Sequence, residues 1–178
     1  MHRYLSREEV EELLELGFLQ YAPHEYFDDD LRSDAATYLL ADWLGCGRVY
    51  LLDAENLAEG GAEFALKEMG AVLAANGVSI GNPQVTYDQL LDVTTLEVDG
   101  CAKVICQWPI PEDSSWEVFS RGFFSIVNEL LSTAGSIERL YACRLYANDQ
   151  SGVLLTPRLF AKFSELGMAS DLVLFGDA

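Results

Sequence analysis

Hydrophobic residues recur at helical spacing in several stretches of the chain, and capping residues mark where the predicted helices begin and end. Ser6 and Glu9 form a capping-box pattern ahead of a valine and leucines spaced three and four residues apart, which predicts a first helix over residues 6–16. The same reasoning predicts helices from Ser33 or Asp34 to Leu44, from Glu59 or Gly61 to Asn76, from Ser115 to Ala134, and from Thr156 or Pro157 to Leu166.

Shorter apolar and β-branched runs indicate strands. Asp99-Gly100 is typical of a two-residue type I′ turn and lies between two such runs, so residues 93–98 and 101–106 are predicted to form a β-hairpin. The same signals predict a buried strand over residues 48–52, a second hairpin from residues 139–146 and 153–155, and a final edge strand over residues 172–175.

The predicted elements follow the order ααβαββαββα(β), which mixes hairpins with helical connections. Such an order favours an α+β fold with a mixed or mostly antiparallel sheet, two β-hairpins and helices packed on one face. With 178 residues, of which 50% are hydrophobic, the chain is long enough to bury one ordinary core. We therefore expect a single domain over residues 1–178, with a helical N-terminal subregion (1–45) and a sheet-containing core (46–178).

The chain is strongly acidic, and this narrows the class of partner. It has 29 Asp and Glu against 11 Lys and Arg, a formal net charge of −18. Residues 1–60 hold 14 acids and 4 bases, so the charge is most concentrated in the N-terminal third. A field of this sign repels nucleic acid and anionic membranes and attracts basic proteins and cations. We expect no nucleic-acid partner and no membrane partner, and we place the contact region in the N-terminal third.

The compartment is inferred from the start of the chain and from its cysteines. The first residues run from a short basic stretch into acidic ones without the apolar segment of a secretory signal, so we expect a cytoplasmic protein. The longest uncharged stretch, residues 69–87, contains glycines, amides and a proline and is not predicted to span a membrane. Four cysteines without metal-ligand spacing are expected to be reduced packing residues: Cys46, Cys101, Cys106 and Cys143.

Catalytic motifs are weak. Residues 77–81 match the letters of a G-x-S-x-G nucleophile elbow, but they follow a predicted helix, precede Pro83, and have no histidine downstream. The two histidines, His2 and His24, both lie upstream of the serine that would need a base. We therefore predict no catalytic residue, no metal and no cofactor.

The carboxylates of the chain suggest one alternative function. Asp53 and Glu55 follow a predicted strand, and with Asp28, Asp29 and Asp30 they could gather around a divalent cation or perform acid–base chemistry. The simpler interpretation of Asp53 is a strand-end or N-cap residue. A carboxylate-based enzyme, with or without a divalent metal, or a small-ligand-binding domain is therefore the alternative function.

The leading hypothesis is a non-enzymatic binding protein that neutralises a basic protein by masking its cationic surface, as an immunity protein or antitoxin does to a nuclease-type toxin. The first helix has an acidic face, and two other segments interleave aromatic rings with carboxylates. The candidate partner-binding residues are Glu8, Glu11, Glu12, Glu15, Tyr26, Asp28, Asp29, Asp30, Trp108, Glu112, Asp113 and Trp116. A homodimer in which the Trp-rich loop packs on its twin is a third hypothesis.

Overall fold

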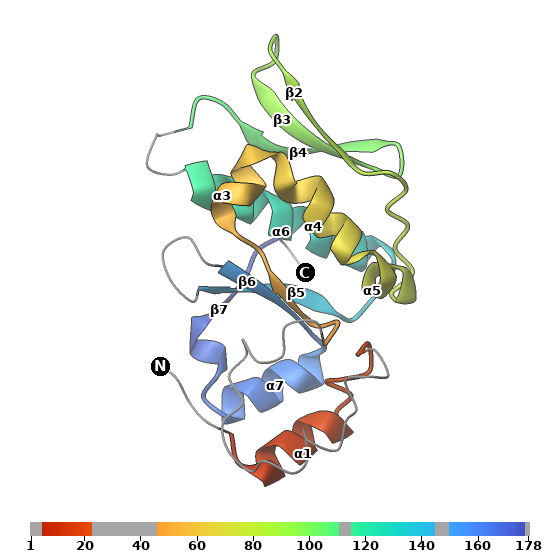
Figure 1. Ribbon diagram of the computed structural model, residues 1–178, viewed down its shortest axis with the longest axis vertical. Helices are drawn as coiled ribbons and strands as arrows, with labels where there is room; N and C mark the ends of the chain where they lie inside the picture. Colours follow the sequence, from red (N-terminus) through yellow and green to blue (C-terminus); the bar gives the residue numbers. More distant parts are fainter. Residues whose placement is uncertain (1–4, 23–45, 111–114, 145–149, 177–178) are drawn as a thin grey trace.

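Two antiparallel sheets and two layers of helices alternate along the long axis of the molecule. The computed structural model describes residues 5–22, 46–110, 115–144 and 150–176. From top to bottom in Figure 1, a three-stranded sheet is followed by a helical layer, a four-stranded sheet, and the helices α7 and α1. The α+β class predicted from the sequence is confirmed.

The elements of the described chain have the following bounds. The helices are α1 (Arg7–Glu15), α3 (Ala54–Asn56), the π-helical turn η3 (Leu57–Gly61), α4 (Ala62–Glu68), α5 (Gly70–Ala75), α6 (Ser115–Thr133), α7 (Pro157–Glu165) and the 3₁₀ turn η5 (Ala169–Asp171). The strands are β1 (Val49–Leu51), β2 (Gln84–Asp88), β3 (Val93–Val98), β4 (Cys101–Gln107), β5 (Arg139–Arg144), β6 (Gln150–Leu155) and β7 (Leu172–Leu174).

Local signals placed most of these elements correctly. Ser6 and Glu9 form the reciprocal bonds of a capping box at the start of α1. Thr156 caps α7 with its side chain, and Pro157 occupies the first turn. Asp99 and Gly100 have φ of 50° and 76°, the left-handed conformation that a type I′ turn requires. The predicted hairpins and the final strand β7 are confirmed, although β6 begins at Gln150 and not at residue 153. The predicted helix over residues 33–44 lies outside the described residues.

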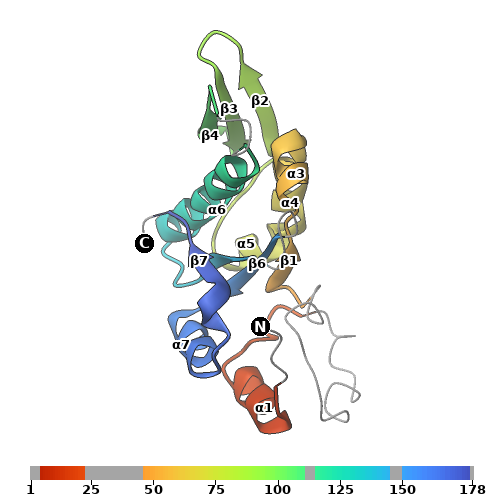
Figure 2. The same ribbon diagram turned by 90° about the vertical axis from the view of Figure 1, so that its left-hand side faces the viewer.

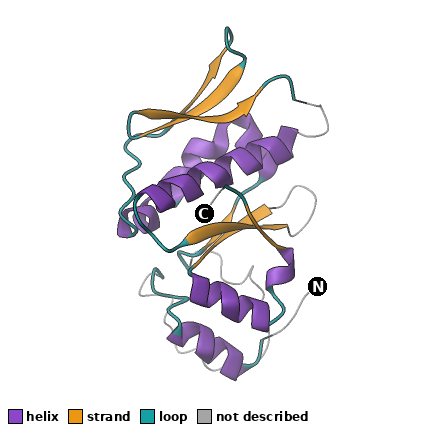
Figure 3. Cartoon of the chain, turned by 180° about the vertical axis from the view of Figure 1, so that it is seen from behind, coloured by secondary structure: helices purple, strands orange, loops and turns teal. Residues whose placement is uncertain are grey.

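The strands divide between two sheets, so the single sheet predicted from the sequence is wrong. The sheet orders are β1-β6-β5-β7 and β2-β3-β4, with every pairing antiparallel. In Figure 3 the helices lie between the two sheets as well as beyond one of them. The physical reason is that α6 connects the two predicted hairpins by crossing the core, so that β4 and β5 lie on opposite sides of this helix.

The four-stranded sheet separates two hydrophobic cores. Every residue of β6 is buried. Leu154 packs into the core shared with α6, α4 and the three-stranded sheet, while its neighbours Val153 and Leu155 pack against α1 and α7. Successive side chains of a strand point to opposite faces, so the apolar run at the end of β6 serves both cores.

The helical path between β1 and β2 is longer and less regular than predicted. It begins at Ala54 instead of Glu59 or Gly61, and it bends at Gly60, whose φ is 100°. The strand β2 was not predicted, because four of its five residues are exposed and its alternation signal is weak. In Figure 2 the β2–β3 hairpin extends away from the helices at the top of the molecule.

An ion pair is buried where the N-terminal segment meets the four-stranded sheet. Arg48 is 0% and Glu138 3% exposed. The guanidinium donates from Nη1 to Glu138 Oε2 at 2.7 Å and from Nη2 to Oε1 at 3.0 Å, and its carbon lies 4.8 Å from the centre of the Tyr21 ring. Nη1 also donates to the Leu154 carbonyl at 2.9 Å, and Nε to the Gly17 carbonyl at 3.3 Å. We call this group of residues the Arg48 junction.

All four cysteines are free thiols, but their environments differ. Cys46, Cys106 and Cys143 are buried, as expected of packing residues. Cys101 is exposed, so its predicted packing role is wrong. Its position directly after the Asp99-Gly100 turn places it at the start of an edge strand, beyond the reach of the core. Among the described residues, no helix combines the length and apolar character needed to cross a membrane.

Candidate binding site

A cavity of about 480 Å³ lies between the bend in the helical layer and the three-stranded sheet. One wall comes from the bend, where Ala58, Glu59 and Gly60 follow one another. The positive φ of Gly60 turns the chain there, and a Cβ at this position would meet nothing within 4 Å, so the wall is open beside the glycine. The bend therefore presents Glu59 at the cavity without closing it.

The opposite wall comes from the sheet. Val85 and Tyr87 alternate along β2, which directs both side chains to the same face, and Asp92 and Thr94 belong to the turn and strand that follow. The backbone N–H of Val85 donates to Glu63 of α4 at 3.4 Å. This bond ties the exposed strand β2 to the helical layer and keeps the two walls together.

Aromatic residues complete the cavity. Trp108 and Pro109 follow β4, and Phe119 comes from α6. The rings of Trp108 and Phe119 meet edge to face with centroids 6.3 Å apart. Close packing of α6 on β4 holds these two residues in place, because a Cβ on Gly122 would lie 2.1 Å from the Ile105 carbonyl oxygen. We call the whole cavity the acidic pocket.

Some polar groups of the acidic pocket form hydrogen bonds with one another. The Tyr87 hydroxyl donates to Asp92 Oδ1, and Trp108 Nε1 donates to Thr94 Oγ1 at 3.4 Å. The hydrogen bond to Asp92 raises the pKa of Tyr87 above its usual range, since the carboxylate stabilises the protonated phenol. Within the described part of the chain, no Lys or Arg forms an ion pair with Glu59 or Asp92.

The chain around the acidic pocket is poor in bases. Residues 49–102, which include both walls, contain nine Asp and Glu but a single base, Lys67. The walls therefore combine apolar and aromatic surface with uncompensated negative charge. Chemically, such a site suits a ligand that has a cationic end and an apolar body.

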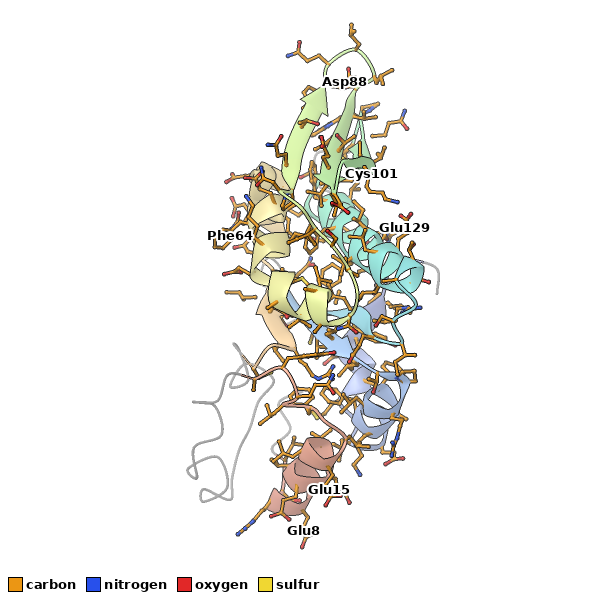
Figure 4. The ribbon with its side chains drawn as sticks, turned by 90° about the vertical axis from the view of Figure 1, so that its right-hand side faces the viewer. Glu8, Glu15, Phe64, Asp88, Cys101 and Glu129 are labelled. Carbon is orange, nitrogen blue, oxygen red and sulfur yellow. The ribbon has the colours of Figure 1, made fainter. Side chains whose placement is uncertain are left out.

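The predicted partner-binding residues of α1 lie at the other end of the molecule. Figure 4 shows Glu8 and Glu15 at the bottom and Asp88, of the β2–β3 hairpin, at the top. The four predicted residues are exposed, but Glu11 pairs with Arg7 at 3.0 Å and Glu12 pairs with Lys162 of α7. The structure thus does not bring the α1 acids together with Trp108.

The two predicted tryptophans differ in their setting. Trp108 lines the acidic pocket and is half-buried. Trp116, in the first turn of α6, is 39% exposed and is not among the lining residues. The remaining candidates, Tyr26, Asp28, Asp29, Asp30, Glu112 and Asp113, lie outside the described residues.

The candidates for catalysis do not assemble in the described chain. Asp53 Oδ1 accepts from the backbone N–H groups of Glu55 and Asn56 at 2.8 and 3.1 Å, which confirms the N-cap interpretation. Residues 77–81 form the loop between α5 and β2, so the G-x-S-x-G pattern has no strand-to-helix turn. Among the residues described, no three His, Cys, Asp or Glu side chains come together as metal ligands.

Of the pocket residues that could carry binding, the sequence points to Trp108 but not to Glu59, Tyr87 or Asp92. Glu59 lies at one of the two predicted starts of a helix, and Tyr87 and Asp92 lie in and after a strand that the sequence does not predict. The signal that could have indicated these residues is the scarcity of Lys and Arg in residues 49–102. Counting the charges of residues 1–60 and 61–178 separately hides it, because the boundary falls inside this range. Comparisons with models of known protein families, with curated proteins and with solved structures found no match.

Proposed function

We propose that this protein is a non-enzymatic binding protein that neutralises a basic protein by masking its cationic surface, in the manner of an immunity protein or antitoxin. The observation that carries the proposal is the acidic pocket, in which Glu59 and Asp92 lie beside Tyr87 and Trp108 without a basic counterion among the described residues. A nuclease-type toxin is the partner class that fits, because such an enzyme must be basic where it binds phosphate.

Two physical effects support this function. The net charge of −18 produces a long-range field that steers a basic partner toward the protein and raises its association rate by roughly 10- to 10³-fold. Steering alone gives little residence time, which depends on a few buried anchors, usually Trp, Tyr or Arg. The acidic pocket supplies Trp108 and Tyr87 at a place where carboxylates are already concentrated.

The proposal also includes the cellular compartment of the protein. We infer a cytoplasmic protein, since a chain with four free cysteines, one of them exposed, suits a reducing environment. An antidote that acts there would meet the toxin before it reaches nucleic acid.

A small-ligand-binding function is the second candidate. The cavity volume of about 480 Å³ falls within the range of ligand pockets, roughly 300–1,000 Å³. Glu59 and Asp92 would then act as binding carboxylates or as an acid–base pair toward a small cationic molecule. This candidate predicts binding without any protein partner.

The experiment is affinity capture of partners from the native cell at low and high salt, with the wild-type protein and with the Glu59→Gln/Asp92→Asn variant side by side. We expect a strongly basic protein whose retention falls steeply with salt and falls further in the variant. A neutral partner, salt-independent retention, or equal retention by the variant would contradict the proposal. Binding of a small cation without any captured protein would favour the second candidate.

A further inference from the structure

We propose that the acidic pocket receives an arginine side chain of the basic partner, an inference that rests on the proposed function and specifies its central contact. The occupant is a guanidinium group with its aliphatic stem, presented from the surface of a folded protein.

The walls match the two halves of an arginine side chain. Val85, Ala58 and the ring of Phe119 offer apolar surface to the methylene stem. Trp108 and Tyr87 contribute aromatic rings to the lining, and aromatic rings interact favourably with a guanidinium. Glu59 and Asp92 offer carboxylate oxygens; Asp92 accepts the Tyr87 hydroxyl at Oδ1, and no described residue donates to its Oδ2. An arginine could therefore contact both carboxylates while its stem stays in apolar surroundings.

The Arg48 junction shows what such an arrangement looks like when it is complete. There the carbon of a guanidinium lies 4.8 Å from the centre of a tyrosine ring, and its two terminal nitrogens donate hydrogen bonds to one carboxylate. The acidic pocket repeats the ring and the carboxylates but has no Lys or Arg among its lining residues. The missing component is thus a guanidinium.

Arginine is favoured over lysine by geometry. A guanidinium is planar and presents five donors in a fixed fork, which suits a site whose lining includes carboxylates on two walls and aromatic side chains. An ammonium is a compact, strongly hydrated charge that gains less from ring faces and cannot bridge the two walls in the same way. The charge of residues 49–102, which carry nine acids and one base, also favours a basic occupant.

The test uses a short probe that requires no knowledge of the partner. The peptide acetyl-Gly-Arg-Gly-amide is titrated into the full-length protein while the indole N–H resonance of Trp108 is followed by NMR. Matched peptides carry citrulline, which keeps the shape and loses the charge, or lysine, which keeps the charge and loses the planar fork. We expect a saturable shift with arginine, at least about tenfold weaker binding with citrulline, and intermediate binding with lysine.

Variants separate the pocket from the general field of the protein. The Glu59→Gln/Asp92→Asn variant should bind the arginine peptide at least about tenfold more weakly than the wild type. The Glu129→Gln/Glu165→Gln variant changes the net charge equally at exposed sites outside the pocket, and we expect it to bind within about twofold of the wild type. Unchanged chemical shifts elsewhere would show that each variant is folded.

Two results would overturn the inference: no saturable shift of Trp108 at arginine-peptide concentrations up to about 10 mM, or equal binding of the citrulline peptide. These failures differ from a failure of the proposed function. If arginine binds but no basic protein is captured from the cell, the function is wrong and the pocket chemistry stands. If a basic protein is captured through Glu59 and Asp92 but the arginine peptide does not bind, only the inference fails.

Discussion

The Arg48 junction and the acidic pocket are built from similar groups but differ in their charge balance. In the junction, Arg48 and Glu138 satisfy each other, and Tyr21 donates its hydroxyl to Glu138 Oε1 at 3.2 Å while its ring lies over the guanidinium. In the pocket, Glu59 and Asp92 lie beside Tyr87 and Trp108 without a cation from the described chain. A balanced cluster can be buried as part of the fold, whereas an unbalanced one is stable only at the surface, where it is available to a partner.

The difference also explains where each cluster lies. The junction joins the N-terminal segment, β1 and the chain before β5, all of which must be in place for the ion pair to be buried. The pocket lies at the rim of the three-stranded sheet, where β2 is largely exposed. We therefore expect substitutions in the junction to affect stability and substitutions in the pocket to affect binding.

The largest effect is expected from breaking the junction. Arg48→Met leaves Glu138 buried without its partner and should lower the free energy of unfolding by about 3–5 kcal/mol. Urea denaturation at neutral pH measures this loss. The double variant Arg48→Met/Glu138→Leu removes both charges and should recover most of the stability. A single-variant loss below about 1 kcal/mol would show that the junction is not the stabilising cluster described here.

A smaller loss should follow from disturbing the packing that supports the pocket. Gly122→Ala places a methyl group against the Ile105 carbonyl oxygen, so α6 must move away from β4 at a cost of about 1–3 kcal/mol. Because Phe119 moves with α6, the Trp108 indole resonance should shift as well. Ser132→Ala, at an exposed position of the same helix, is the matched control and should change stability by less than about 0.5 kcal/mol. Equal effects of the two variants would contradict the close-packing argument.

Alkaline pH should weaken the fold through buried thiol and phenol groups. Desolvation raises the pKa of the Cys46 and Cys143 thiols and of the Tyr50 phenol, so the folded protein keeps these protons when the unfolded chain loses them. The unfolded state then binds fewer protons, and stability falls as the pH rises through the ordinary thiol pKa of about 8.5 and the phenol pKa of about 10. Urea denaturation across this pH range should show the decline.

The Cys46→Ala/Cys143→Ala variant provides the control for this pH dependence. It should be less sensitive to pH between about 8 and 9.5 than the wild type, because two of the linked groups are gone. A wild-type stability that is flat or rising over this range would contradict the assignment.

The smallest effect is a local titration in the pocket. Asp92 accepts the Tyr87 hydroxyl and raises its pKa, so Asp92→Asn should bring the pKa of Tyr87 down toward its ordinary value of about 10. NMR titration of the Tyr87 ring measures this change. Tyr141, whose pKa is raised by burial in the second core, should titrate identically in the variant and the wild type. A Tyr87 pKa unaffected by the substitution would contradict the hydrogen bond.

The sequence predicted those elements whose signals are local. Asp99-Gly100 fixes its own turn, and Thr156-Pro157 marks the start of a helix regardless of what surrounds it. The strand β2 was not predicted because it is held in place by its pairing with β3. It is not held by the burial of one of its faces, and such burial is what gives a strand its alternating hydrophobic pattern. The division into two sheets could not be predicted either. It depends on α6 passing between the strands, and the local sequence does not determine the order of strands in a sheet.

The candidate site was less predictable than the fold for the same reason. Trp108 stood out as a ring near carboxylates, but its neighbours in space, Glu59 and Tyr87, are distant along the chain. A bend at Gly60 and a sheet edge bring them together, and neither has a periodic signature. The acidic face of α1 was easier to recognise because consecutive turns of one helix display it.

The most direct test of the account compares these two acidic faces with equal changes in charge. The affinity of the captured basic protein is measured for the wild type, for Glu59→Gln/Asp92→Asn and for Glu8→Gln/Glu15→Gln at one salt concentration. We predict that the pocket variant loses at least about tenfold in affinity, equivalent to about 1.4 kcal/mol, and the α1 variant less than about threefold. Equal losses, or a larger loss from the α1 variant, would show that the partner does not dock at the acidic pocket.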